Sequence, residues 1–233
     1  MDISFIDNLA YNTESIMHRA SAPAKILMVG LIITTVVISG SPVSLAVALI
    51  TLVVVVLISR LPVAKILSLA SYAFFFSLIF ALSQVGGGIT APVVIVLKAT
   101  VAALSLLLLI TTTPYPQIFA ILQKVLPSVL VDAMLVTYRS FFVLIGQISS
   151  RITVIRIRAG YSPLNIVKNL SDTGSIIGHG FIHAWELSES MQDAMFVRGY
   201  TGKFPLSLPL SSISWHDAFP LAIGLLILLV AVV

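Results

Sequence analysis

Apolar residues fill five long stretches of the chain, and most polar residues gather between the fourth stretch and the fifth. An α-helix needs about 20 predominantly apolar residues to cross a hydrocarbon core of about 30 Å. We therefore expect membrane-spanning helices over residues 24–40, 43–59, 66–85, 91–113 and 215–233. The last stretch is still apolar at Val233, which leaves open whether the protein continues.

The connections between the first four stretches are short and differ in charge. Residues 40–42 and 86–88 contain no lysine or arginine, whereas the connection between them contains Arg60 and the N-terminal segment contains Arg19. Because cytoplasmic loops carry an excess of basic residues, this asymmetry predicts a cytoplasmic N-terminus. Residues 1–23 lack the basic start and small-residue cleavage site of a signal peptide, so we expect the first helix to be retained.

The polar middle of the chain begins with a short amphipathic pattern. Between Pro116 and Leu126, apolar residues recur at positions i, i+3, i+4, i+7 and i+8, as on one face of a helix. Such a helix is too short to span a bilayer. We expect it to lie along the membrane surface and to end at Pro127.

Two further helical regions follow. A long helix is expected from Ser128 to Arg158, near the membrane interface, because it contains ionisable residues that cost roughly 2.5–3.5 kcal/mol each at a bilayer centre. Ser162-Pro163 is a helix start signal, and residues 172–174 predict a break. A last helix of this region is expected from about Ser175 to Arg198.

Composition supports a membrane protein. The chain is 58% hydrophobic and 9% charged, against roughly 45–50% and about 25% in soluble domains. Its net charge of +4 is small. In a membrane protein such a charge reports the orientation of the chain in the bilayer more than a nucleic-acid partner, so we exclude nucleic-acid binding. The chain has no cysteine, which excludes disulfides, thiolate metal sites and cysteine nucleophiles.

Two helices of the middle region are predicted to end on an arginine close to a glycine and a tyrosine. The first end contains Arg156, Arg158 and Gly160, and the second contains Arg198 and Gly199. Simple helix capping explains each end alone, because a cation suits the negative end of the helix dipole and glycine accepts the left-handed conformation. The duplication favours a docking role, because a guanidinium offers a planar fork of donors to carboxylates and carbonyls.

With these residues the chain resembles the transmembrane T component of energy-coupling factor (ECF) transporters, whose cytoplasmic coupling helices carry two Ala-Arg-Gly boxes. The resemblance covers most of the chain, including residues 111–114 and 193–200, although Ile157 and Val197 stand where the family usually has alanine. Residues 6–11 and 198–203 look most like the branch that serves cobalt or nickel uptake, known as CbiQ-type. An amphipathic N-terminal lead-in explains the first of these segments equally well.

The resemblance implies a non-catalytic subunit of an ATP-driven importer in the inner membrane of a prokaryotic cell. Two ABC ATPase subunits would bind ATP and Mg²⁺, and each would accept one arginine box. A separate substrate-capturing membrane subunit, the S component, would be reoriented by the movement. This chain would then bind no cofactor itself. T components that serve vitamin uptake, such as that of biotin or riboflavin, are the alternative.

One group of side chains suggests a metal site. His179, His183 and Glu186 lie at i, i+4 and i+7 on one helix face, and they are ligand types suited to zinc, nickel or cobalt. A hydrolytic zinc motif needs glutamate directly after the first histidine, where this chain has Gly180. The acidic residues that follow read more simply as a solvated face or as partners of basic residues.

We therefore expect an all-α integral membrane protein with about five spans. Its segments are a cytoplasmic N-terminus (1–23), a four-helix membrane unit (24–113), a cytoplasmic coupling-helix region (114–212) and a final transmembrane helix (213–233). A self-contained permease or channel is a rival, and it would need polar groups along a pathway. A structural scaffold is a third possibility, but it would not require two arginine ends.

Overall fold

The computed structural model describes residues 15–59, 61–84, 90–157, 166–202, 204 and 215–232. All regular structure in these ranges is helical, which confirms the all-α class. The chain divides into two compact units. Unit 1 comprises Met1–Ile121 and Leu208–Val233, and unit 2 comprises Leu122–Ser207.

Unit 1 contains the apolar helices that the sequence predicts as spans. Each lies within three residues of the predicted bounds, so the predicted positions of these helices are confirmed. The helices of this unit are α2 (Ile16–Arg19), α3 (Ala22–Ile38), α4 (Pro42–Ile58), α5 (Val63–Leu82), α6 (Thr90–Thr112), α7 (Tyr115–Leu122), the 3₁₀ turn η2 (Trp215–Asp217) and α10 (Ala218–Val232).

Serine and proline set where several of these helices begin. Ser21 and Ser41 are the residues before α3 and α4, and each of these helices has a proline in its first two positions. Proline suits that position because its missing N–H would have no partner there and its φ angle is already helical. The same missing N–H lets a proline stop a helix, and α6 ends two residues before Pro114.

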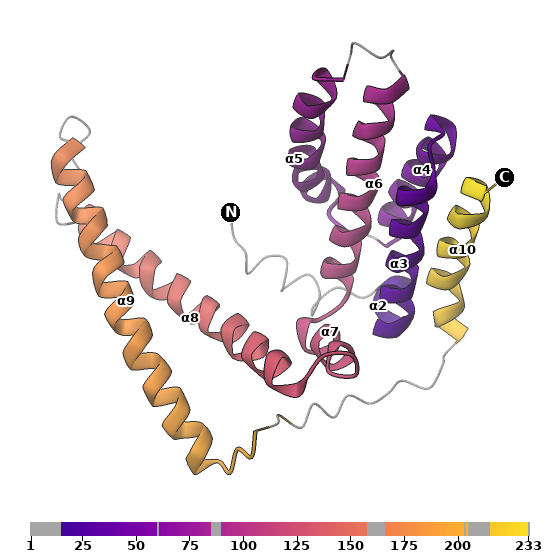
Figure 1. Ribbon diagram of the computed structural model, residues 1–233. Coiled ribbons are helices and arrows are strands. Elements are labelled where there is room, and N and C mark those ends of the chain that lie inside the picture. Colours follow the sequence, from indigo (N-terminus) through magenta and orange to yellow (C-terminus); the bar gives the residue numbers. More distant parts are fainter. Residues whose placement is uncertain are drawn as a thin grey trace. The chain divides into compact units, whose positions relative to one another are not determined.

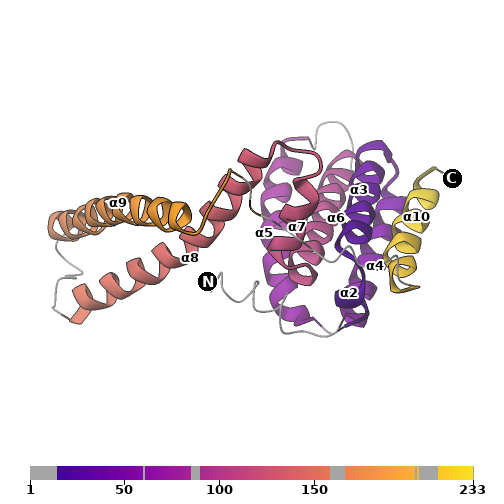
Figure 2. The ribbon, with the colours of Figure 1, turned by 90° about the horizontal axis from the view of Figure 1, so that it is seen from below.

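The helices of unit 1 pack around α6. Helix α6 contacts α3, α4 and α5, and α10 lies against α3 and α4 on the side away from α5 (Figures 1 and 2). The core is apolar and includes Met28, Ile32, Leu52, Leu108 and Ile227.

Helices α3 and α10 approach each other closely at Gly224. A Cβ atom placed there would lie 3.2 Å from the backbone Cα of Met28 and 3.1 Å from Cδ1 of Leu31. Small residues allow transmembrane helices this proximity. The glycine is therefore a packing requirement.

By length and composition, three helical segments of the described chain suffice to cross a membrane. They are Val63–Leu82, Thr90–Thr112 and Ser128–Val154, and three shorter apolar helices cover Ala22–Ile38, Pro42–Ile58 and Ala218–Ala231. Phe74, Phe75 and Phe76 of α5 are exposed, as expected for side chains that meet lipid. These features confirm an integral membrane protein.

Unit 2 contains two long helices, α8 (Ser128–Ile157) and α9 (Ile166–Val197), which lie at an angle to each other (Figure 1). The first part of α8 contacts the last part of α9. The predicted break at residues 172–174 is wrong, because α9 is continuous through them. The hydroxyl of Thr173 donates a 2.7 Å hydrogen bond to the carbonyl of Asn169 one turn earlier, so this polar side chain is satisfied inside the helix.

The short surface helix is also shorter than predicted. Helix α7 ends at Leu122, and hydrogen bonds from the amides of Val125 and Leu126 to the carbonyl of Leu122 continue the chain as a turn. The apolar pattern runs on through these residues. The pattern alone therefore does not distinguish the helix from the turn that follows it.

Candidate coupling site

Helix α9 ends in a hydrogen-bonded turn around Arg198. The amide of Tyr200 donates to the carbonyl of Met195, and the amide of Gly199 donates to the carbonyl of Phe196, each at 3.0 Å. This pair of bonds is the Schellman motif, which satisfies carbonyls that a helix end leaves without partners. Arg198 is the residue that closes the helix.

Gly199 makes this turn possible. Its φ angle is +76°, in the left-handed region that side chains disfavour. No atom lies within 4 Å of a Cβ built at Gly199, so the backbone conformation and not crowding requires glycine. Arg198 is exposed at the negative end of the α9 dipole, where its positive charge is favourable.

A buried carboxylate near the start of α8 holds the segment that follows this turn. The hydroxyl of Tyr200 donates a 2.8 Å hydrogen bond to Oδ2 of Asp132, and the amide of Phe204 donates to the same oxygen at 3.2 Å. The rings of Tyr200 and Phe204 also contact each other, with centroids 4.9 Å apart. Asp132 is 3% exposed.

The contact with Asp132 changes the acidity of the Tyr200 phenol. Its hydrogen bond to the Asp132 carboxylate raises the pKa of Tyr200 above the ordinary 10.0, and desolvation and the negative charge of Asp132 act in the same direction. The phenol therefore stays neutral and continues to donate at physiological pH.

Sequence reasoning missed this role of Asp132 and treated it only as a charge that disfavours a span. The two partners are separated by 68 residues, so no local pattern connects them. The available signal in the sequence is the tyrosine that follows the glycine at each arginine end. This pattern indicates the turn, but it does not identify the carboxylate that binds the tyrosine.

The first arginine end is described only in part. Arg156 lies in the last turn of α8, and Ile157, the last residue of that helix, is 78% exposed. Arg158 and Gly160 lie outside the described residues. Their docking role therefore stays a prediction.

The suggested metal ligands do not form a three-ligand group. Nδ1 of His183 lies 3.4 Å from Oε2 of Glu186. Across the described residues, His179 and these two do not gather with one another or with other His, Cys, Asp or Glu residues to form a site for an ion. Glu186, Glu189 and Asp193 are exposed, as a solvated face would be.

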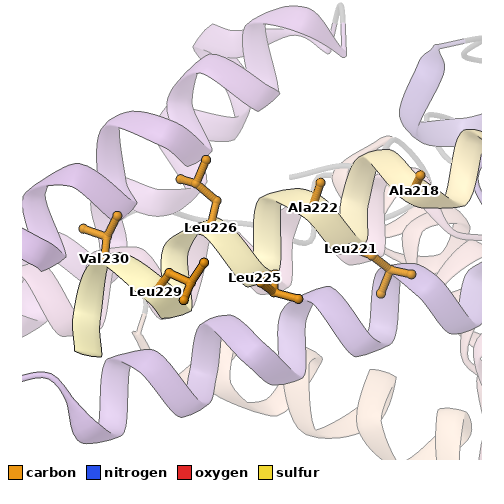
Figure 3. A pocket seen from close by; sticks show the side chains of 7 residues that line it. All are labelled: Ala218, Leu221, Ala222, Leu225, Leu226, Leu229 and Val230. Atoms are coloured by element: carbon orange, nitrogen blue, oxygen red, sulfur yellow. The ribbon is translucent and has the colours of Figure 1, made fainter. Parts of the chain in front are cut away.

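Two of the grooves on the described helices differ in the polarity of their lining. In unit 2, a groove between α8 and α9 is lined by residues that include Thr137, Ser140, Ser188 and Gln192. On α10, a groove is lined only by alanine, leucine and valine side chains (Figure 3). With no polar group to orient a ligand, the α10 groove has the character of a lipid-facing surface.

Comparison with known proteins identifies the family. The family model described as CbiQ, cobalt transport protein, matches residues 13–207, a range that includes both arginine ends. An uncharacterized protein of Methanocaldococcus jannaschii, MJ1089, is 36% identical over 103 residues, which are 44% of this chain and 38% of that protein. A protein of Methanocorpusculum labreanum described as a fused cobalt transport protein, CbiMQ, is 32% identical over 141 residues, 57% of this chain and 23% of that protein.

The matched segments cover well under two thirds of either relative. The family model, in contrast, covers most of this chain. The chain is therefore a member of the CbiQ family of cobalt transport proteins and an integral membrane protein.

Proposed function

We propose that this chain is the transmembrane coupling subunit, or T component, of an ECF-type ABC importer. Two ATPase subunits bind its arginine ends, and nucleotide-driven movement of the ATPases passes through α8 and α9 to a separate membrane subunit that captures the substrate. ATP and Mg²⁺ are bound by the ATPases. The chain itself contributes binding and movement, not catalysis.

The exposed arginine at the end of α9 carries this proposal. Arg198 extends beyond a turn that is fixed by the Schellman bonds and by the contact of Tyr200 with Asp132. An arginine whose backbone is fixed in this way can offer its guanidinium to a groove on a soluble partner with little loss of backbone entropy. The side chain is exposed at the end of a 32-residue helix, where a partner can reach it.

Helix α9 also presents an exposed apolar stripe. Ile177, Phe181 and Trp185 lie four residues apart and are 68%, 71% and 64% exposed. Arg198 is about 20 Å from Trp185 along the helix, at 1.5 Å per residue. A rigid helix with a docking arginine at its end and an apolar stripe along its length can pass a movement from the ATPases to the substrate-capturing subunit.

The substrate proposed is cobalt or nickel. It rests on the family and on residues 6–11 and 198–203, of which the second segment lies in the range that the family model matches and the first lies before it. The fused relative is described as a cobalt transport protein, which agrees with this choice. Vitamin uptake is the alternative. Uptake of radioactive cobalt(II) that is suppressed by unlabelled cobalt(II) but not by biotin or riboflavin would distinguish metal transport from vitamin transport.

A self-contained permease fits the described helices poorly. Many hydroxyls in the spanning helices donate to carbonyls of their own helix, as Thr35, Thr51, Ser77 and Thr100 do. These hydroxyls use their hydrogen bonds within their own helix and do not line a polar path through the membrane.

A cytoplasmic N-terminus is part of the proposal. With four spans before the coupling region, both arginine ends then lie on the ATPase side.

Purification of the protein with its native partners tests the proposal. The tagged full chain is extracted from its own membranes in mild detergent, and the co-purifying proteins are identified by mass spectrometry. The proposal predicts two ABC ATPase subunits and a small membrane protein, together with ATP-dependent uptake of radioactive cobalt(II) by the reconstituted complex. A chain that transports cobalt(II) without ATPases would contradict it.

A further inference from the structure

A lysine is buried at one end of the helices of unit 1. Lys25 lies in the first turn of α3, and 1% of its surface is exposed. Its ammonium group donates a 2.8 Å hydrogen bond to the backbone carbonyl of Thr112, 87 residues further along the chain. Burial of an ammonium is unfavourable unless it is paired, so its partners indicate its role.

The first partner is the end of α6. Thr112 is the last residue of that helix, and its carbonyl is one of those that lack a partner within a helix. The hydroxyls of Thr111 and Thr112 donate to carbonyls one turn earlier in α6, so neither competes for this carbonyl. Lys25 thus closes α6 and places a cation at the negative end of its dipole.

The second partner comes from the other end of the sequence. Asp217, the last residue of η2, lies directly before α10 and is 3% exposed. Its Oδ1 accepts a 2.6 Å hydrogen bond from the amide of Ser21, the residue that caps α3, across 196 residues. Its negative charge also acts on the ammonium of Lys25. The first turn of α3 therefore holds both the end of α6 and the start of α10.

These two points lie in unit 1, each ten residues along the chain from a boundary with unit 2. Unit 2 begins at Leu122, ten residues after the end of α6, and it ends at Ser207, before η2. A movement of unit 2 that travels through the polypeptide reaches unit 1 at these two connections. If the first turn of α3 fixes both connections, the movement acts on the whole of unit 1. Without this fixation, the movement would only rearrange the end of α6 or the start of α10.

We propose that Ser21, Lys25 and Asp217 form an anchor that fixes both connections of the coupling region to the membrane unit, with Lys25 as a positioning residue for coupling. The inference rests on the proposed function and adds the residues that convert ATPase movement into uptake. Arg198 still binds the ATPases when the anchor is lost. ATP hydrolysis therefore continues, while substrate uptake falls.

The chain provides a matched control. Lys98 of α6 donates a 3.3 Å hydrogen bond to the carbonyl of Val37 in α3, so it too joins these two helices through an ammonium and a backbone carbonyl. Val37 lies at the opposite end of α3 from Lys25, and neither Lys98 nor Val37 adjoins a connection to unit 2. Lys98→Met removes a less buried lysine that makes the same type of bond, without touching the anchor.

The test measures ATP hydrolysis and uptake of radioactive cobalt(II) in the same proteoliposomes, which contain the full transporter and equal amounts of inserted variant. Lys25→Met and Asp217→Asn are expected to lower the cobalt(II) taken up per ATP hydrolysed by about tenfold. The first removes the hydrogen bond from Lys25 to the end of α6, and the second removes the negative charge that acts on Lys25 and weakens the bond to the Ser21 amide. Both ATPases should still co-purify. Lys98→Met should keep the wild-type ratio.

A second readout does not depend on transport. Asp217→Asn keeps an acceptor oxygen near the Ser21 amide but weakens the hydrogen bond, since a carboxylate is the stronger acceptor. Hydrogen exchange of the peptide that contains Ser21 should therefore be faster in this variant than in the wild type and in Lys98→Met. If Lys25→Met fails to insert, Asp217→Asn decides, because it preserves side-chain size.

The outcomes separate the anchor from the proposed function. Wild-type uptake per ATP in Asp217→Asn, with unchanged exchange at Ser21, overturns the anchor but leaves the coupling role intact. Absence of ATPases from the purified wild-type protein overturns the coupling role instead. In that case the exchange of the Ser21 amide still tests whether Asp217 holds the start of α3.

Discussion

The hydroxyl of Tyr200 donates a 2.8 Å hydrogen bond to the carboxylate of Asp132, which lies 68 residues earlier, near the start of α8. Because Tyr200 directly follows Arg198 and Gly199, this bond ties the end of α9 to the neighbouring helix. The candidate docking arginine is thus held by the backbone bonds of the helix end and by a buried carboxylate.

The first prediction concerns pH. The pKa of Tyr200 is raised above 10.0 by its bond to Asp132, so this bond contributes stability fully below about pH 10, and the contribution is lost as pH rises through the folded pKa. We expect the tyrosinate absorbance of the wild type, minus that of Tyr200→Phe, to titrate above pH 10. A difference that titrates at or below the ordinary value would contradict the contact.

Gly199→Ala should destabilise the end of α9. Alanine in the left-handed conformation costs about 1–2 kcal/mol. Gly178→Ala is the matched control, because Gly178 lies inside α9 with no atom within 4 Å of an added Cβ, and alanine there should be more favourable by up to about 1 kcal/mol. Hydrogen exchange of the peptide around Tyr200 should be faster in Gly199→Ala and unchanged or slower in Gly178→Ala. Equal effects would argue against a conformational requirement at Gly199.

Gly224→Val should weaken the packing of α10 against α3. Even the first atom of the new side chain would lie 3.2 Å from the backbone of Met28, and such overpacking typically costs about 1–3 kcal/mol. Gly30→Val in α3 is the control, since nothing lies within 4 Å of a Cβ there. The unfolding temperature of the purified protein in detergent should fall clearly more for Gly224→Val. A similar loss in both variants would mean that helix propensity, not close approach, explains the effect.

The spans could be predicted from the sequence because hydrophobicity over some 20 residues is a strong local signal. Helices α3 to α6 and α10 follow their apolar runs within three residues. The end of α9 was also predictable, because Arg198-Gly199 is a local C-cap pattern. Local signals therefore defined the helices and the candidate arginine.

Features that depend on contacts between distant residues could not be predicted. Thr173 and Gly174 are weak helix formers, and their pattern suggested a break, yet α9 continues through them and packs against α8. Tertiary packing commonly overrides such local preferences. The contacts of Asp132 and Asp217 likewise leave no local pattern in the sequence, because their partners lie 68 and 196 residues away.

The exposed stripe of α9 should matter for uptake. Phe181→Glu places a charge on it, whereas Ser190→Glu places the same charge about 180° around the helix at an exposed position. We expect Phe181→Glu to reduce cobalt(II) uptake and co-purification of the substrate-capturing subunit by about tenfold, and Ser190→Glu to change neither. Equal uptake in both variants would remove the stripe from the coupling path.

The docking of Arg198 is the central claim. Arg198→Glu should leave expression, membrane insertion and thermal unfolding unchanged, because the side chain is exposed beyond the helix end. Loss of one partner of a buried charge pair typically costs 2–5 kcal/mol, and reversal of the charge adds repulsion, so the ATPase bound at the end of α9 should be lost. Lys124→Glu, which changes an exposed cation outside both arginine ends, is the control.

The most direct measurement is therefore ATP-dependent uptake of radioactive cobalt(II), together with the ATPase content of the purified complex, for the wild type, Lys124→Glu and Arg198→Glu. We predict normal uptake and two bound ATPases in the first two proteins. In Arg198→Glu we predict loss of uptake and of the ATPase bound at the end of α9. Normal uptake by Arg198→Glu at wild-type protein levels would contradict the account.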